Sequence, residues 1–212
     1  MLFRKIRVAL VRVRKWTEGK KAPIVLLTGV GVSMVVVTLT ATTIIYTSTE
    51  EFCSTTCHEM TTNVAMEFKG TIHDKNRTGV RATCADCHLP HHGQIPLYLR
   101  KMGAVNDLWG HFVTHSIDTR EKFEAKRQQL AERVWIYMKE NDSRECRGCH
   151  DAAKMDPEKQ SEKARDRHAK GKREKLTCIE CHFAIAHNEP QGGVGPQELE
   201  VEKSLIPKGA IF

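Results

Sequence analysis

The stretch EEFCSTTCHEM, residues 50–60, places two cysteines and a histidine directly after a long uncharged run. Three similar groups follow, and the four together use all eight cysteines of the chain: Cys53, Cys57 and His58; Cys84, Cys87 and His88; Cys146, Cys149 and His150; Cys178, Cys181 and His182. The last three have the spacing C-x-x-C-H, in which two thiols can add to one porphyrin and the adjoining imidazole can bind its iron. The sequence therefore predicts four covalently bound c-type haems.

Two other interpretations of the cysteine pairs are weaker. Paired C-x-x-C units also form four-cysteine zinc sites, and exported chains also form disulfides. Neither explains a histidine directly after every second cysteine. Chance is a poor explanation for the same reason.

The first group differs from the other three, because three residues rather than two separate its thiols. The longer loop changes how the peptide crosses the porphyrin edge and where His58 lies. Met60 is then an alternative axial ligand, whose thioether would raise the reduction potential relative to a bis-histidine haem. An ordinary apolar role for Met60 is the other interpretation.

The composition limits what else the chain can build. Of 212 residues, 40% are hydrophobic and 6% aromatic, which fits one modest domain and one membrane segment better than a large enzyme core. Strand signals are absent, and QGGVGPQE (191–198) is typical of a loop or tail. We expect a mainly α fold with much irregular structure, in which haem ligation organises a multihaem cytochrome c domain.

Residues 24–46, IVLLTGVGVSMVVVTLTATTIIY, carry no charge, and a helix of this length spans the hydrocarbon layer of about 30 Å. A cleaved signal peptide is the alternative, but the apolar run is too long for one and no clear A-x-A site follows it. We expect an uncleaved single-pass anchor in the lipid bilayer of the inner (cytoplasmic) membrane. Its hydroxyls can bond to helix carbonyls, and the small residues of GVGVS (29–33) could support a homo-oligomer.

The net charge of +7 is concentrated in the N-terminal tail. Residues 1–23 hold eight lysines and arginines against one glutamate, so the rest of the chain has a net charge of zero. This distribution indicates no nucleic-acid partner. By the positive-inside bias, the tail is cytoplasmic and the haem domain is periplasmic. The expected organisation is a cytoplasmic tail 1–23, an anchor 24–46, a tetrahaem domain 47–192 and a C-terminal tail 193–212.

Seven histidines lie outside the four groups and are candidates for the second axial ligands: His73, His91, His92, His111, His115, His168 and His187. Their positions repeat between the two halves of the domain. Intervals of 15, 15 and 3 residues separate His58, His73, His88 and His91, and intervals of 18, 14 and 5 separate His150, His168, His182 and His187.

This repeat predicts two dihaem modules related by duplication. It favours His73, His168 and His187 as axial ligands. His91 is a weaker candidate, because it follows His88 by only three residues. The remaining histidines receive no role.

A long helix is expected between the modules. The segment DTREKFEAKRQQLAERVWIYMKEND (118–142) begins with a capping-type Asp118-x-x-Glu121 and stops near Asn141. Its apolar residues recur at helical spacing: Phe123, Leu130, Val134, Tyr137 and Met138.

Together these features resemble the NapC/NirT family of membrane-anchored tetrahaem quinol dehydrogenases, which includes the anchor subunit of cytochrome c nitrite reductase. The resemblance runs from the anchor through AIAH (184–187). Its most specific pieces are EFCSTTCHEM (51–60), IHDKNRTGVRATCADCHLPH (72–91), EKFEAKRQQLAERVW (121–135), NDSRECRGCHD (141–151) and TCIECHFAIAH (177–187).

The resemblance implies a quinone site beside the first haem, with Met60 rather than His58 on the iron, Asp107 near its opposite face and Lys101 as a nearby cation. It also implies that His187, His73 and His168 serve the second, third and fourth haems. The spacing in CSTTC departs from the family pattern, which usually has two residues between these cysteines.

Quinol oxidation releases two electrons and two protons, whereas each haem takes one electron, so the site needs a proton acceptor. Lys101 and Asp107 can flank a pocket at the membrane surface, where partial desolvation raises the pKa of a carboxylate. A solvated ion pair is the alternative.

We expect a quinol dehydrogenase that takes electrons from membrane quinol and passes them to a periplasmic redox enzyme or cytochrome. The same haems could work in reverse, as a quinone reductase fed by a periplasmic multihaem dehydrogenase of the hydroxylamine-oxidising type. A terminal reductase at an open haem and a structural metal anchor are further alternatives.

Overall fold

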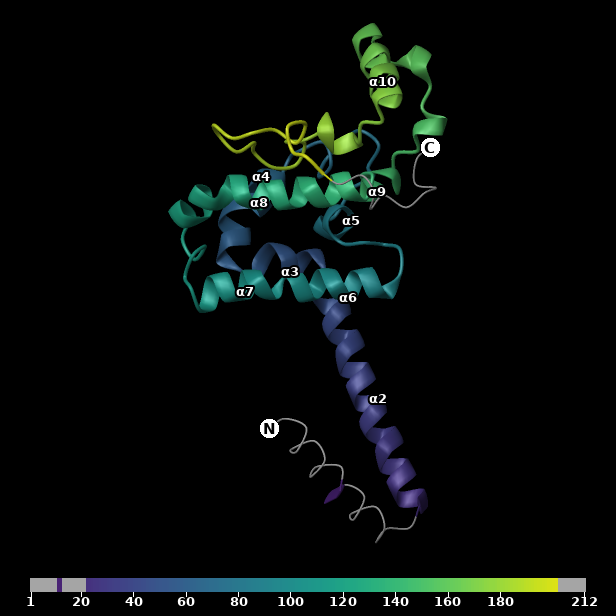
Figure 1. Ribbon diagram of the computed structural model, residues 1–212, viewed down its shortest axis with the longest axis vertical. Coiled ribbons are helices and arrows are strands. Elements are labelled where there is room, and N and C mark those ends of the chain that lie inside the picture. The colour runs from purple at the N-terminus through teal and green to yellow at the C-terminus, as the bar shows by residue number, and fades with distance from the viewer. Residues whose placement is uncertain (1–10, 13–21, 202–212) are drawn as a thin grey trace. The chain divides into compact units, whose positions relative to one another are not determined.

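The computed structural model describes residues 11–12 and 22–201, so most of the expected N-terminal tail and residues 202–212 lie outside the described part. Contacts divide the chain into two units, 1–47 and 48–212. Within the described residues the regular elements are all helices or helical turns, without strands (Figure 1). The expected mainly α fold is confirmed. The division of the haem domain into two dihaem modules stays a prediction.

Helix α2, Ala22–Tyr46, is the long element of the first unit. Its stretch Pro23–Tyr46 has a mean hydropathy of 2.3 and, among the described residues, is the one helix long and apolar enough to cross a membrane. The hydroxyl of Thr28 donates to the carbonyl of Ile24 at 2.8 Å, and Thr40 donates to Val36 at 2.8 Å. These hydroxyls therefore bond back to helix carbonyls as expected, which suits them to apolar surroundings.

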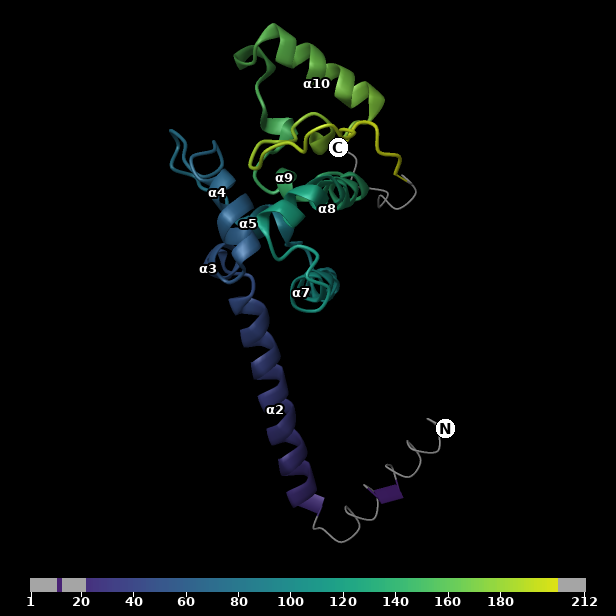
Figure 2. The same ribbon diagram turned by 90° about the vertical axis from the view of Figure 1, so that its left-hand side faces the viewer.

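The second unit consists of short helices joined by irregular segments. In chain order these are α3 (Glu50–Thr55), a π-helix (Met60–Val64), α4 (Ala65–Phe68), α5 (Cys84–His88), α6 (Gln94–Gly103), α7 (Val105–Phe112), α8 (Arg120–Glu140), α9 (Arg144–Arg147), the 3₁₀ turns Ala152–Lys154 and Pro157–Lys159, α10 (Glu162–Glu174) and the 3₁₀ turn Cys178–Glu180. Helices α6 and α7 follow one line, and α8 runs back alongside them in both ribbon views (Figure 1, Figure 2).

Helix α8 occupies the predicted position and ends at Glu140, before Asn141. Its N-cap is Thr119 and not Asp118, so the predicted cap was wrong by one residue. Thr119 has the extended backbone of a cap, and its hydroxyl accepts from the N–H of Lys122 at 3.4 Å. Asp118 instead binds the ammonium group of Lys122 at 2.7 Å.

The apolar core of the second unit is small. Its buried hydrophobic side chains, among the described residues, are Phe68, Phe123, Trp135, Met138 and Ile179. The last three form one cluster, and Phe183 packs edge-on against Trp135 with ring centroids 5.9 Å apart. This agrees with the expectation that a conventional core does not organise the domain.

The buried ammonium group of Lys139 holds the C-terminal segment against α8 through hydrogen bonds. The Lys139 ammonium donates to the carbonyls of Pro196 at 2.8 Å and Leu199 at 2.6 Å, and it lies 3.2 Å from the Glu180 carboxylate. Because Lys139 and Glu180 are both buried, each supplies the partner that the other needs away from water.

We predict that Trp135→Ala lowers the free energy of unfolding by about 3–5 kcal/mol, because a large side chain leaves a cavity in a core with few other members. Val80→Ala is the control, because Val80 is 69% exposed, and its effect should stay within about 0.5 kcal/mol. Denaturant unfolding of the mature protein in detergent measures both. Equal losses in the two variants would contradict this account of the core.

Candidate haem sites

The second and fourth cysteine groups share one local design. Thr83 precedes Cys84 and forms a reciprocal cap with Asp86, whose carboxylate accepts from the Thr83 backbone N–H at 2.7 Å. Thr177 precedes Cys178 and forms the same cap with Glu180, at 2.6 Å. The pattern Thr-Cys-x-acid-Cys-His thus bends each group into one helical turn that carries both cysteines and leads into the histidine.

Three of the motif histidines face a histidine from elsewhere in the chain. The ring centroids of His88 and His187 are 6.1 Å apart, those of His150 and His73 are 6.2 Å apart, and those of His182 and His168 are 6.0 Å apart. Since a metal–imidazole bond is about 2 Å long, this separation leaves room for one metal ion between the two rings of each pair.

The donor chemistry at these pairs fits haem. All eight cysteines are free of disulfides and at least partly accessible, as thioether attachment requires. Burial lowers the pKa of His88 to about 4, which keeps its imidazole in the neutral form that binds metals. Nδ1 of His73 is buried with no hydrogen-bond partner in the described part of the chain. The residues present therefore suit c-type haem with two imidazole ligands.

A hydrogen bond orients the ring of His168, and an ion-pair network holds the segment next to His187. Nδ1 of His168 lies 2.8 Å from the side-chain oxygen of Gln160, so the other ring nitrogen, Nε2, points away from Gln160. Next to His187, the backbone N–H of Asn188 donates to Glu67 at 2.9 Å. Glu67 in turn forms a two-pronged ion pair with the nearly buried Arg127, at 2.6 and 2.9 Å. This network ties the segment that holds His187 to α4 and α8.

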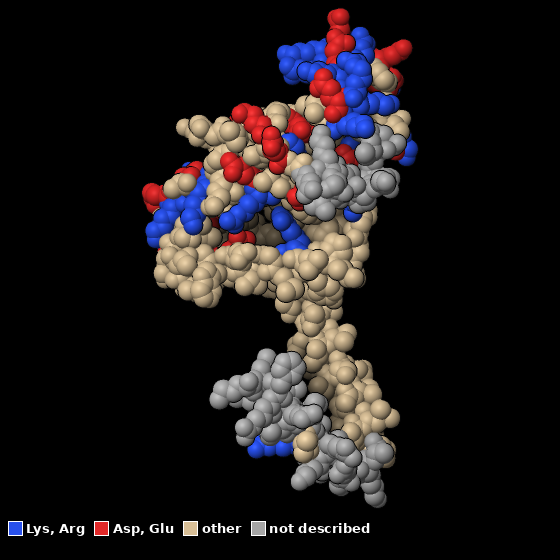
Figure 3. Space-filling model, viewed as in Figure 1, with Lys and Arg blue, Asp and Glu red and all other residues tan. Residues whose placement is uncertain are grey.

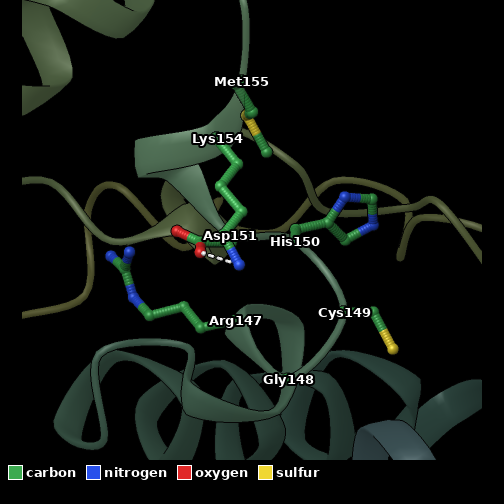
Figure 4. A pocket seen from close by; sticks show the side chains of 7 residues that line it. All are labelled: Arg147, Gly148, Cys149, His150, Asp151, Lys154 and Met155. Carbon is green, nitrogen blue, oxygen red and sulfur yellow. Dashed lines mark ion pairs between the residues drawn. The ribbon is translucent and has the colours of Figure 1, made fainter.

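The third cysteine group borders an open pocket of about 560 Å³. Figure 4 shows the Cys149 thiol and the His150 imidazole on one side of the loop and the Arg147 guanidinium on the other. Lys154 and Asp151 form an ion pair of 3.4 Å at the pocket wall. The pocket is large enough for a cofactor, and one of the two attachment cysteines, Cys149, lines it.

The first cysteine group has different surroundings. Helix α3 carries Cys53, and the π-helix Met60–Val64 begins two residues after His58. Such wide turns are rare and frequent at functional sites. His58 is exposed and Met60 half-buried, and no second imidazole faces His58 within the described residues.

Lys101 and Asp107 lie close to this group. The Lys101 ammonium acts electrostatically on the Cys53 thiol, and the Asp107 carboxylate acts on the Cys57 thiol. Burial lowers the pKa of Lys101. Burial also raises the pKa of Asp107, although Arg133 and Arg100 act in the opposite direction. Asp107 lines an open pocket of about 430 Å³, to which α7 and α8 both contribute.

The thiols of successive cysteine groups lie close enough to act on one another electrostatically. Burial raises the pKa of Cys84 to about 11, and the nearby Cys53 thiolate adds to this. Burial likewise raises the pKa of Cys87, with Cys149 contributing. It raises the pKa of Cys146 to about 11, with Cys178 as the next cause. Each cysteine group is therefore a close neighbour of the next along the chain.

The other histidines lie apart from these pairs, and one that sequence reasoning left without a role lies beside the first cysteine group. His91 is exposed and its Nε2 lies 3.3 Å from the Asp86 carbonyl, and His115 pairs with Asp118 at 3.1 Å. His111 of α7 contacts the buried carboxylate of Glu59, the residue between His58 and Met60. The acidic residue Glu59, within the stretch EEFCSTTCHEM, was the sequence signal that could have pointed to His111.

The fold and these sites define a multihaem c-type cytochrome. The family described as NapC/NirT cytochrome c family, N-terminal region, matches residues 16–192, and the chain belongs to this family.

Three relatives illustrate the similarity. The chain is 51% identical over 146 residues to the denitrification system component NirT of Stutzerimonas stutzeri, which covers 69% of this chain and 71% of that protein. It is 51% identical over 144 residues, 68% and 76% of the two chains, to an Allochromatium vinosum protein whose name describes a tetraheme cytochrome-c type. It is 47% identical over 159 residues to the cytochrome c-type protein NapC of Paracoccus pantotrophus, and the match covers 73% of this chain and 65% of that protein. No solved structure matches the chain.

We predict that Arg127→Leu loosens the segment around His187, because it leaves Glu67 nearly buried without its cation, at a cost of about 3 kcal/mol or more. Electron paramagnetic resonance should then show part of one low-spin haem signal converted to high-spin. Arg120→Leu is the control, since Arg120 is exposed on the same helix. Unchanged low-spin signals in Arg127→Leu would contradict a positioning role for the network.

Proposed function

We propose that this protein is a single-pass, membrane-anchored tetrahaem cytochrome c that moves electrons between quinol in the inner membrane and a periplasmic redox enzyme or cytochrome. The observation that carries the proposal is the ordered run of cysteine groups, which starts within seven residues of the end of α2 and proceeds by neighbouring thiols to the fourth group. Family membership supports the cytochrome part of the proposal, and α2 supports the anchor.

In this proposal two histidines would hold the iron of each of three haems: His88 with His187, His150 with His73, and His182 with His168. The iron of the haem attached at Cys53 and Cys57 would be held by Met60, with His58 as the alternative. The half-burial of Met60 and the exposure of His58 favour the thioether. His91 remains a weaker candidate, because its ring contacts the Asp86 carbonyl. Bound haems supply one-electron transfer.

Lys101 and Asp107 are proposed to handle the quinol. The Lys101 ammonium can donate a hydrogen bond to a quinol oxygen, and the Asp107 carboxylate can accept a proton from a quinol hydroxyl. Partial desolvation raises the pKa of Asp107, so it holds a proton at a higher pH than an aspartate fully surrounded by water does. Its contact with solvent then allows that proton to leave to water.

Quinol oxidation that feeds a periplasmic reductase is the proposed direction, with the basic tail cytoplasmic and the second unit periplasmic. The name of one relative, a denitrification system component, is compatible with a reductase as the partner. The opposite direction would use the same residues.

We predict that Asp107→Asn lowers the turnover of a quinol analogue at least about 100-fold, because the amide cannot accept a proton. The wild-type rate should fall as pH drops through the raised pKa of Asp107, since the protonated carboxyl can no longer act as acceptor. The variant should lose this dependence. Stopped-flow haem reduction measures both.

The control for this experiment is Asp166→Asn on the exposed face of α10, which should behave as the wild type. A pyridine haemochrome assay confirms that all variants keep four haems. Unchanged quinol turnover in Asp107→Asn would contradict the proposed role, and a protein without haem would contradict the proposed function altogether.

We further predict that His73→Ala removes one ligand from the iron bound at His150, so that one low-spin signal is lost while the haem content stays the same. Near-infrared magnetic circular dichroism, which is sensitive to axial ligands, measures this. His92→Ala is the matched control, because His92 is exposed. A spectrum of His73→Ala identical to that of the control would refute the pairing.

A further inference from the structure

The two helices that carry Lys101 and Asp107 expose an apolar stripe. On α6 the large apolar side chains at the surface are Ile95, Tyr98, Leu99 and Met102. Their spacing of i, i+3, i+4 and i+7 puts them on one helix face. Three of the four are at least 63% exposed, so the stripe does not pack against the rest of the protein.

Helix α7 carries an exposed apolar stripe with the same spacing. Its exposed apolar side chains are Val105, Leu108, Trp109 and Phe112, again at i, i+3, i+4 and i+7. Trp109 is 59% exposed and Phe112 is 67% exposed. Figure 3 shows the consequence as a band without blue or red along α6 and α7, while charged residues gather on other parts of the unit.

Two polar side chains of the same helices, Arg100 and His111, point inward. Arg100 stacks over the ring of Tyr137 on α8, 4.6 Å from its centroid, and donates to the His88 carbonyl at 3.3 Å. His111 contacts the buried Glu59. A helix on a water-facing surface buries its apolar face, whereas α6 and α7 expose their apolar stripes and direct Arg100 and His111 inward. The medium against their outer face is therefore apolar.

Covalent distance identifies that medium. Cys53 follows Tyr46 by seven residues, and at about 3.5 Å per residue it lies within about 25 Å of the end of α2. Lys101 on α6 acts on the Cys53 thiol, and Asp107 on α7 acts on the Cys57 thiol. Both helices are thus held near the point where the chain leaves the anchor, and both carry an exposed aromatic residue of the kind enriched at membrane interfaces, Tyr98 and Trp109.

We propose that α6 and α7 form an interfacial helix pair that lies in the surface of the lipid bilayer with its apolar stripe among the acyl chains. The pair is a second membrane attachment beside the spanning helix. It holds the pocket of Asp107 at the depth where a lipid-soluble substrate arrives. This inference rests on the proposed anchoring by α2, and it is independent of quinol oxidation.

The test is photolabelling of the full-length mature cytochrome, one copy per lipid nanodisc, with a phospholipid that carries a photoreactive group in its acyl chain. Mass spectrometry then maps the labelled peptides. We expect label on residues 24–46 and on residues 94–113, with none on α10, which is exposed but lacks an apolar stripe. The label on residues 24–46 reports the anchor by itself.

Variants sharpen the result. Leu99→Glu places a charge in the stripe and should lower labelling of residues 94–113 severalfold, while labelling of residues 24–46 stays unchanged. Val80→Glu is the control, because Val80 is 69% exposed, close to the 63% of Leu99, but lies outside the stripe. Label confined to residues 24–46 would overturn the inference and leave the anchor intact.

Two other outcomes identify a different occupant or a wrong premise. Crosslinks between residues 94–113 of two copies in detergent, combined with no lipid label there, would show that a second copy covers the stripe and would overturn the inference. Label on neither segment would overturn the anchoring and the inference together. Quinol turnover is measured in parallel, so that its loss is not confused with either result.

Discussion

The second unit depends on three pairs of imidazoles whose ring centroids lie 6.0 to 6.2 Å apart. Two of the pairs, His88 with His187 and His73 with His150, join positions distant in the sequence, so an iron bound between their rings would close a long loop. The apolar core has too few members to supply this constraint. The hydrogen bonds and ion pairs around the histidines, such as that of Gln160 with His168, fix the orientation of rings that would otherwise be free to rotate.

The pairs also connect the two halves of the domain. His73 lies in the first half and faces His150 in the second, while His187 lies in the second half and faces His88 in the first. Only His168 and His182 pair within one half. Neither half could therefore complete its own metal ligation. If the domain arose by duplication, as the histidine spacing suggests, its two copies are now dependent on each other.

The features set by adjacent residues were accessible from the sequence. The cysteine groups, the uncharged run of α2 and the periodicity of α8 each depend on local spacing. The cap of α8 was misplaced by one residue because Asp118 and Thr119 both have capping side chains, and only the extended backbone of Thr119 decides between them. Spacing alone could not assign the histidines outside the cysteine groups to particular irons, because the assignment depends on how distant segments fold together. The resemblance to a family implied the pairs that face each other in the structure.

The contact of His111 with Glu59 and the orientation of α6 and α7 could not be read from periodicity either. A stripe at i, i+3, i+4 and i+7 shows that a helix has an apolar face, but not what covers it. Usually the core does. In α6 and α7 the inward positions are taken by Arg100, Lys101 and His111, and this reverses the usual interpretation.

The first site differs from the other three in the kind of groups that surround it. Three sites pair imidazoles and differ mainly in the hydrogen bonds that hold the rings. The first site alone combines a longer loop between its thiols, a π-helix, and an ammonium and a carboxylate close to the cysteines. This asymmetry is what a two-electron, two-proton substrate requires in the proposed function, because protons must be removed where the substrate binds, whereas the later sites exchange only electrons. Placing the acid–base groups on helices with an apolar outer face lets one structural element both meet a substrate from the lipid and remove its protons.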